Sequence, residues 1–189
     1  MTAYAVPETS ERTSTLQRKV AGLCHLIRWA SLAWIGWTLA IILQKWSNAE
    51  VLKQTWGRYL NLDLTALPAS HHAFAFAVVL IDWTFAALLV VFVWRLFGCY
   101  LRGSIFSAEA ATEMRNIGLA GVASVAADMI ARPLIQVLLS WHLGAGARSF
   151  SFWAEPNDIL HILTALFVVA LAHIFKAGVE IADDHRQII

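Results

Sequence analysis

Three ionisable side chains fall deep inside long apolar stretches of this chain, where water is not expected to reach them. Asp82 belongs to the second stretch, and Asp128 and Arg132 stand four residues apart in the third. Residues four apart share one face of a helix, so Asp128 and Arg132 can contact each other. A charge inside an apolar helix is costly unless it has a partner or a purpose. We therefore expect a buried charge cluster of Asp82, Asp128 and Arg132, which either fixes helix packing or responds to protons or a ligand.

Four histidines near the ends of the apolar stretches suggest a second kind of chemistry. His25 and His173 fall near the ends expected on one side of the molecule, and His142 and His161 fall near those on the other. Two such pairs are what a membrane protein holding two haems would need. The plainer interpretation is that water and backbone groups satisfy all four. The sequence has no zinc spacing, phosphate-binding glycine loop or Ser/His/Asp context, so we expect no catalytic residue, metal site or cofactor.

The elements that must position these side chains are four long apolar stretches, over residues 23–43, 73–98, 116–141 and 159–176. A helix needs about 20 apolar residues to cross a bilayer core, and backbone groups in lipid must be satisfied within the segment. Hydrophobic residues make up 59% of the 189 residues and charged residues 14%, with a mean hydropathy of +0.61. The predicted fold class is an all-α polytopic membrane protein, a four-helix bundle built from two antiparallel hairpins of transmembrane helices.

Polar residues flank this membrane domain. Residues 1–22 are expected to be a disordered tail, 23–177 the transmembrane domain and 178–189 a second tail. Lysine and arginine in the flanks predict the orientation, since they are enriched on the cytoplasmic side. Eight of them fall on the side of both termini and four on the other side, which favours both termini in the cytoplasm.

Two shorter patterns predict local structure. Residues 49–60 place apolar side chains at helical spacing opposite Lys53 and Arg58, which predicts a short amphipathic helix at the membrane interface. Gly118 and Gly121 open the third apolar stretch among alanines. Small residues allow helices to approach closely in a membrane, so we expect the tight seam of the bundle here.

The polar segment between the second and third stretches is the most distinctive part of the chain. Gly103 supplies a turn, and Ser107 is a good N-cap, so the next helix is expected to begin near Ala108. Apolar side chains just before this cap either close the end of the bundle or serve as anchors within a polar rim, as interfaces require. On the second interpretation, we expect a docking surface for a partner at Arg102, Phe106, Glu109, Arg115, Asp183 and Asp184, with Glu113 and Ile105 also exposed there.

The run GSIFSAEAATEMRNIG, over residues 103–118, resembles the signature of a bacterial family of four-helix integral membrane proteins catalogued as domain of unknown function 2975. The matching positions are Gly103, Phe106, Ser107, Met114, Arg115, Ile117 and Gly118. The polar ending ADDHRQII is loosely similar to the family's C-terminal motif, and the resemblance covers roughly residue 23 to the end. Some members are similar to membrane partners of small helix-turn-helix regulators, which implies a cytoplasmic regulatory protein as partner.

Together these observations predict a non-enzymatic, multi-pass protein of the bacterial inner membrane that restrains or signals to a cytoplasmic protein such as a helix-turn-helix regulator. Its expected contacts are the lipid bilayer, this partner and other copies of itself. A net charge of +1 gives no basis for direct nucleic-acid binding. Two alternatives stay open: a haem-binding redox protein using the four histidines, and a small proton-coupled transporter using Asp82, Asp128 and Arg132.

Overall fold

The described part of the chain is built from five α-helices and contains no strand. The computed structural model describes residues 8–60, 63–144, 148, 150–152 and 154–187. The helices are α1 (Glu8–Ser47), α2 (Ala49–Leu60), α3 (Ala69–Leu101), α4 (Ala108–Ser140) and α5 (Pro156–Gln187). Four of them contain segments long and apolar enough to cross a membrane, namely Ala21–Ser47, Ala69–Leu101, Ala108–Ser140 and Pro156–Ala182. The chain is an all-α, multi-pass membrane protein, as predicted.

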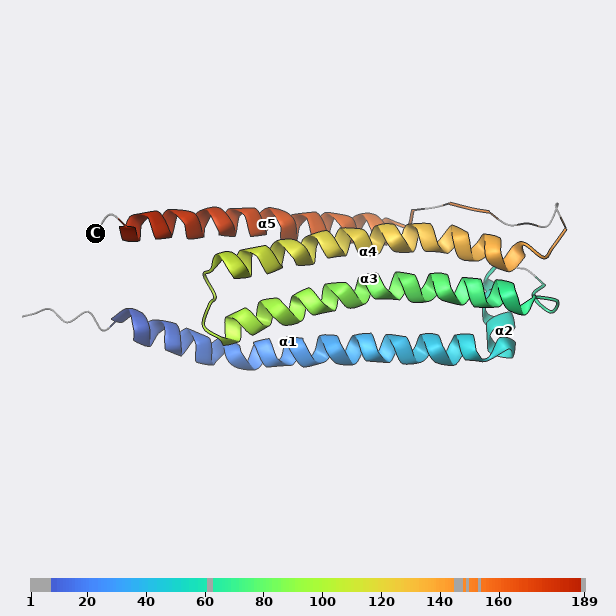
Figure 1. The fold of residues 1–189 in the computed structure, drawn as a ribbon, viewed down its shortest axis with the longest axis horizontal. Coiled ribbons are helices and arrows are strands. Elements are labelled where there is room, and N and C mark those ends of the chain that lie inside the picture. Colours follow the sequence, from blue (N-terminus) through green and yellow to red (C-terminus); the bar gives the residue numbers. More distant parts are fainter. Residues whose placement is uncertain (1–7, 61–62, 145–147, 149, 153, 188–189) are drawn as a thin grey trace, which may run out of the picture.

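The four long helices lie side by side in a row, in the order α1, α3, α4, α5 (Figure 1). α3 packs against α1 and α4, and α4 packs against α5, while α1 and α5 form opposite edges. Neighbours run in opposite directions, so α1 begins and α5 ends at one end of the molecule, which we call the terminal end; the other is the α2 end. Within a single chain, the four long helices are therefore arranged as an open row. Apolar edges that face lipid gain little by turning inward, so the row need not close.

The outer helices continue well beyond the apolar stretches. α1 begins at Glu8 and so includes residues 8–22 of the expected N-terminal tail, and α5 remains helical through residue 187 of the expected second tail. Residues 1–7 and 188–189 lie outside the described part. No proline falls within residues 8–47 or after Pro156. Once a helix is nucleated, each further residue adds a hydrogen bond at small cost, so it extends into polar sequence.

Side-chain caps fix where two helices begin. The Asn48 side chain accepts hydrogen bonds from the backbone N–H groups of Glu50 (3.0 Å) and Val51 (3.4 Å), which separates α2 from the end of α1. The Ser107 hydroxyl accepts one from the backbone N–H of Ala110 at 3.1 Å, at the start of α4. Both are N-caps, which satisfy amide groups that the helix itself leaves free. The predicted helix over 49–60 and the predicted start at Ala108 are confirmed.

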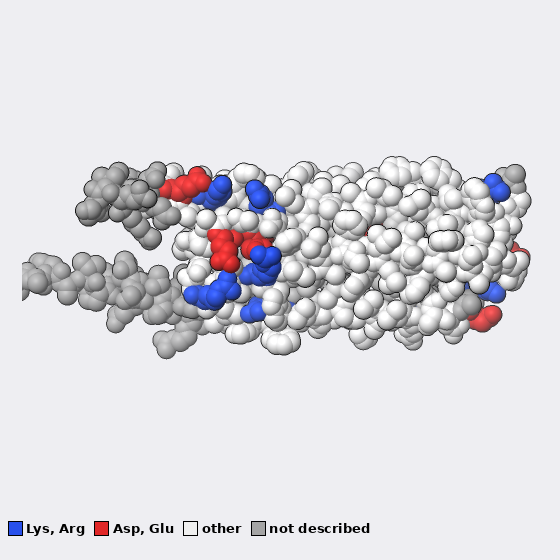
Figure 2. All heavy atoms as spheres, viewed as in Figure 1, with Lys and Arg blue, Asp and Glu red and all other residues white. Residues whose placement is uncertain are grey.

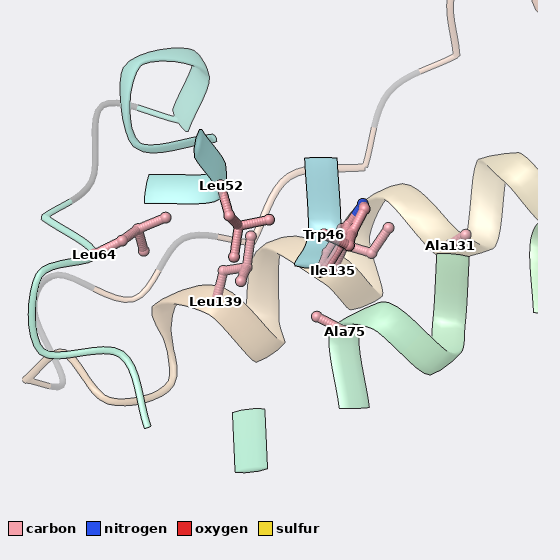
Figure 3. Packing of buried hydrophobic residues seen from close by; sticks show 7 residues of the cluster. All are labelled: Trp46, Leu52, Leu64, Ala75, Ala131, Ile135 and Leu139. Atoms are coloured by element: carbon pink, nitrogen blue, oxygen red, sulfur yellow. The ribbon is translucent and has the colours of Figure 1, made fainter. Parts of the chain in front are cut away.

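A compact apolar cluster joins the helices at the α2 end. Leu52 of α2 is 1% exposed and lies close to Leu139 of α4, with Leu64 beside them (Figure 3). Trp46 at the end of α1 completes the cluster and stacks on the His72 ring of α3 at 5.7 Å. Leu52 and Trp56, on the apolar side of α2, thus pack against the other helices, and the short helix covers this end of the row.

Close packing between α4 and α5 depends on a glycine. A Cβ atom added at Gly118 would stand 2.5 Å from Val169 Cγ2 and 2.8 Å from the Ala165 carbonyl oxygen. The latter is a backbone atom of α5, so the two helices approach too closely for any larger residue. Gly121 is less crowded, with the Ala165 Cβ atom at 3.1 Å from its added Cβ. The predicted seam therefore exists, and it lies between α4 and α5.

Candidate functional site

The charged side chain of Arg132 forms the most elaborate polar site among the apolar helices. Its Nη1 atom donates to Asp158 Oδ2 and its Nη2 atom to Asp158 Oδ1, both at 2.8 Å. Such a two-pronged pair between guanidinium and carboxylate is the strongest form of charge-assisted hydrogen bond in proteins. The Asp158 side chain is 5% exposed and that of Arg132 is 23% exposed. The pair is therefore held largely away from solvent and links α4 to α5.

Asp158 occupies this position because of how α5 begins. Pro156 is the first residue of the helix, where its missing N–H group and fixed φ angle are favourable. Asp158, two residues later, accepts a hydrogen bond through Oδ2 from the backbone N–H of Glu155 at 2.8 Å. This is the reciprocal half of a capping box, and the helix dipole favours a carboxylate there. One carboxylate thus starts α5 and binds α4.

Asp128 and Glu155 complete the surroundings of the guanidinium. Asp128, one turn earlier on α4, contacts Nη2 of Arg132 through Oδ2. Glu155 Oε1 lies 3.9 Å from Nη1. The structure thus brings Asp128 and Arg132 together, as expected from their spacing. Three carboxylates surround one cation, so the negative charges outnumber the positive one.

Asp82, on α3, is not among the carboxylates that bind the Arg132 guanidinium. It makes no hydrogen bond or ion pair with any described residue, since Arg132 turns toward α5. The Asp82 side chain instead lines a cavity of about 240 Å³ between α3 and α4. The other lining residues are apolar: Val78, Ile81, Phe85, Ala127, Ile130, Ala131 and Leu134. The sequence alone did not give the direction in which each of these side chains points around its helix.

The geometry of the Arg132 cluster supports a packing role. Both terminal nitrogens of the guanidinium have carboxylate partners, so a ligand would have to displace an existing bond. The pair lies on the side of α4 that also carries Gly118, so it closes the same α4–α5 seam. A bidentate, mostly buried pair fixes the rotation and register of one helix against the other. We interpret it as the device that sets α5 against α4.

Two of the four histidines expected as haem ligands lie too far apart to form one pair within a chain. His25 belongs to α1 and His173 to α5, at opposite edges of the row, so one chain cannot bring both to one iron. His173 Nδ1 donates to the Val169 carbonyl oxygen at 2.8 Å, and His142 Nε2 lies 3.3 Å from the Asp63 carbonyl oxygen. His161 is exposed. Within the described residues, no group of three or more metal-binding side chains comes together.

Charged side chains gather at the terminal end, while the long middle of the molecule is nearly free of them in the view of Figure 2. Arg95 of α3 pairs with Glu113 of α4 at 2.7 Å, and Arg102 pairs with Glu109 at 3.0 Å. The Glu113 side chain is 4% exposed, so its expected place on an outer docking surface is wrong. It instead ties α3 to α4 from inside. The Arg102–Glu109 pair is exposed and belongs to the surface.

The loop between α3 and α4 holds a large apolar side chain outward. Gly103 has φ 86°, a conformation that favours glycine, and it turns the chain after α3. The Ser104 N–H donates to the Cys99 carbonyl oxygen at 3.1 Å, and the Ser107 cap secures the other side. Phe106 is 73% exposed, although its ring stacks on Phe175 of α5 at 5.5 Å. The contact with α5 therefore covers only a small part of the surface of this ring.

The remaining residues of the expected docking surface do not all lie at the loop between α3 and α4. Arg115 lines a pocket between α4 and α5. Asp183, Asp184 and Arg186 belong to the last turns of α5, and their side chains lie outside what the structure describes. Ile105 is only partly exposed. The described part of the docking surface therefore consists of Arg102, Phe106 and Glu109.

The sequence interpretation missed Asp158 as the main partner of Arg132. The fourth apolar stretch was taken to begin at residue 159, which left this carboxylate just outside it. The signal that reveals it is local: Pro156 followed by Asp158, directly before an apolar run, is the pattern of a helix start. A carboxylate in that first turn stands at the same end of the molecule as the later part of α4.

Comparison with known proteins gives one match. The model of a family described as "Protein of unknown function (DUF2975)" matches residues 30–189, which is most of the chain. Searches against curated proteins and against solved structures gave no match.

Proposed function

We propose, since the chain belongs to the DUF2975 family, that it is a membrane-bound interaction partner that restrains or signals to a cytoplasmic regulatory protein. The proposed docking surface is Arg102, Phe106 and Glu109, on the loop between α3 and α4 and the first turn of α4. A helix-turn-helix regulator is the partner that the resemblance of the family suggests. The terminal end would then face the cytoplasm of a bacterial cell, in agreement with the excess of lysine and arginine there.

The observation that carries this proposal is the outward position of Phe106 on an ordered loop. A ring that is 73% exposed leaves most of its area free for another molecule. Arg102 and Glu109 stand at this loop with side chains 61% and 57% exposed, which gives the ring a polar rim. Interfaces combine an apolar anchor with such a rim, and aromatic side chains often contribute most of the affinity. The positive φ at Gly103 and the Ser107 cap hold the anchor in place before binding.

The transport alternative has weaker support. Four helices in a row do not surround a central space, so a pathway would need a second copy of the chain. The cavity beside Asp82 is lined by apolar side chains otherwise, and the Arg132 guanidinium is occupied by Asp128 and Asp158. The haem alternative also has weaker support, because His25 and His173 lie on helices at opposite edges of the row.

The test is recovery of the partner from cells. A photo-crosslinking amino acid placed at position 106 should capture a cytoplasmic protein, identified by mass spectrometry. Phe106→Ala, and separately deletion of the last six residues, should each reduce co-purification of that protein while leaving membrane insertion intact. A matched control is Phe152→Ala, because Phe152 is also exposed (60%) but belongs to the segment before α5 at the α2 end. Retention of the partner by both variants, or capture of lipid alone, would contradict the proposal.

A further inference from the structure

A basic pocket lies between α4 and α5 at the terminal end. It has a volume of about 70 Å³ and is lined by Ala111, Thr112, Arg115, Ala172, His173 and Lys176. It is separate from the Arg132 cluster, which stands at the other end of the same two helices. We propose that this pocket binds the phosphate of an anionic phospholipid, so that the protein holds a lipid of the leaflet at its terminal end.

The pocket has positive charge that no described carboxylate neutralises strongly. Arg115 has no ion pair with a described residue. Lys176 pairs with Glu180 at 3.6 Å, but the two side chains are 57% and 65% exposed. An exposed pair of this kind contributes little and is easily exchanged for another anion. An incoming phosphate would therefore meet two available cations, one from each helix.

The other two polar side chains of the pocket already donate to backbone carbonyl groups, so we assign phosphate binding to Arg115 and Lys176. The Thr112 hydroxyl donates to the Ala108 carbonyl oxygen at 2.8 Å, and His173 Nδ1 donates to the Val169 carbonyl oxygen at 2.8 Å. Arg115 offers a planar fork of donors that fits a phosphate, and Lys176 adds a second, compact charge. Donors from two helices would hold one phosphate between them.

The position of the pocket along the helices matches a headgroup. Arg115 directly precedes the apolar run of α4, and Lys176 ends the apolar run of α5. Charged side chains gather at this end of the molecule and are nearly absent from the middle (Figure 2). Basic pockets between transmembrane helices at this level are suited to the headgroups of anionic lipids.

Apolar side chains continue from the pocket toward the middle of the molecule. Leu119, one turn beyond Arg115, is 52% exposed, and Leu166, two turns before His173, is 49% exposed. Spacings of four and seven residues keep these leucines on the same helix faces as the pocket residues. The acyl chains of a bound lipid would lie along these leucines. A free phosphate ion has no acyl chains and would not need such an apolar surface.

The experiment is native mass spectrometry of the full chain in mild detergent, titrated with phosphatidylglycerol, phosphatidylcholine or inorganic phosphate. Phosphatidylglycerol should bind more tightly than phosphatidylcholine. Arg115→Gln and Lys176→Gln should each weaken phosphatidylglycerol binding about fivefold, as expected for one cation near an anionic surface. The control is Lys53→Gln with Arg148→Gln at the α2 end, which should not change it.

Charge-conserving variants separate binding from folding. Arg115→Lys with Lys176→Arg should retain phosphatidylglycerol, and all variants should keep the helical circular dichroism of the parent. Phe106→Ala should also keep the lipid, which makes this test independent of the partner proposed above. The proposal is overturned if the double glutamine variant binds phosphatidylglycerol as the parent does, or if the α2-end control loses it equally. Displacement of the lipid by millimolar inorganic phosphate would show a free-anion site and would also overturn it.

Discussion

The guanidinium of Arg132 in α4 holds the carboxylate of Asp158 in the first turn of α5 through two hydrogen bonds of 2.8 Å. Asp158 also accepts from the backbone N–H of Glu155, so the same carboxylate starts α5 and fastens it to α4. The loop between the two helices runs from residue 141 to 155 and is itself tied to α4, because the Ser151 N–H (3.1 Å) and hydroxyl (2.9 Å) both donate to Gln136 Oε1. The ion pair adds a direct link between α4 and α5.

Removing Arg132 alone should therefore be worse than removing the pair. Arg132→Gln leaves Asp158, whose side chain is 5% exposed, without its cation. Such a loss costs about 3–5 kcal/mol in buried pairs, whereas Arg132→Gln with Asp158→Asn leaves no uncompensated charge there and should cost less. The measurement is unfolding in mixed micelles of increasing SDS content, followed by circular dichroism. Asp158→Asn alone completes a double-mutant cycle, and a loss in the double variant equal to the sum of the two single losses would show that the two residues are not coupled.

A control for this cycle is the exposed pair at the terminal end. Arg102 and Glu109 have side chains 61% and 57% exposed, so Arg102→Gln should change the free energy of unfolding by less than about 1 kcal/mol. A large effect there would mean that charge removal destabilises the protein regardless of burial.

Gly118→Ala should destabilise the α4–α5 seam. The added methyl group would stand 2.8 Å from the backbone carbonyl oxygen of Ala165, which cannot move without shifting α5. Overpacking of this kind costs about 1–3 kcal/mol. Gly36→Ala is the matched change, since an added Cβ there meets nothing within 4 Å. If both variants unfold at the same SDS content, the two helices do not pack as closely as described.

The orientation of the row can be tested with single cysteines. We expect Ala108→Cys, at the terminal end, to react with a membrane-impermeant maleimide only after the membrane is permeabilised. Gln54→Cys, on α2, should react in intact cells. The native Cys24 and Cys99 are each 1% exposed, so their own labelling should be slow. The reverse pattern would place the Phe106 loop outside the cytoplasm and would contradict the proposed binding of a cytoplasmic protein.

The turn before α3 should show a depressed carboxyl pKa. The Asp63 carboxylate accepts from the Thr65 hydroxyl at 2.7 Å and from the Thr65 N–H at 3.0 Å, and these bonds lower the pKa of Asp63 below its ordinary value of 3.8. A depressed pKa means that the turn is stabilised above pH 3.8 and loses this contribution as the pH falls through the lower, folded value. Carbon NMR titration of Asp63 measures this pKa directly, and Thr65→Val should raise it. An unchanged pKa in that variant would show that the hydroxyl is not the cause.

Local signals in the sequence were sufficient for the helices and their starts. Ser107 marked the start of α4, and the spacing of apolar side chains over 49–60 identified α2. These features depend on neighbouring residues only. The arrangement as a row depends on lipid covering the outer faces, and apolar composition is the same for a face against lipid and a face against protein.

For a similar reason, the sequence predicted only those contacts of the polar site that lie within one helix. Spacing of four residues placed Asp128 against Arg132, since both belong to one helix. The sequence did not give the rotation of α3 or α4 about their axes. Arg132 turns toward α5 and Asp82 toward the cavity on the α3 side, so the two charges that seemed paired belong to different interfaces.

The row of helices also sets how the protein comes apart. Each inner helix has two long neighbours and each outer helix has one, so stability is a sum of nearest-neighbour contacts, as in a linear array. Detachment of α1 removes its contacts with α3 and the cluster under α2, and it leaves the Arg132–Asp158 pair and the Gly118 seam untouched. Pulling on the N-terminus of a single molecule should therefore extract α1 as a separate event, before the α4–α5 pair gives way. A membrane protein of this shape behaves as a linear array of separable helices and not as one cooperative unit.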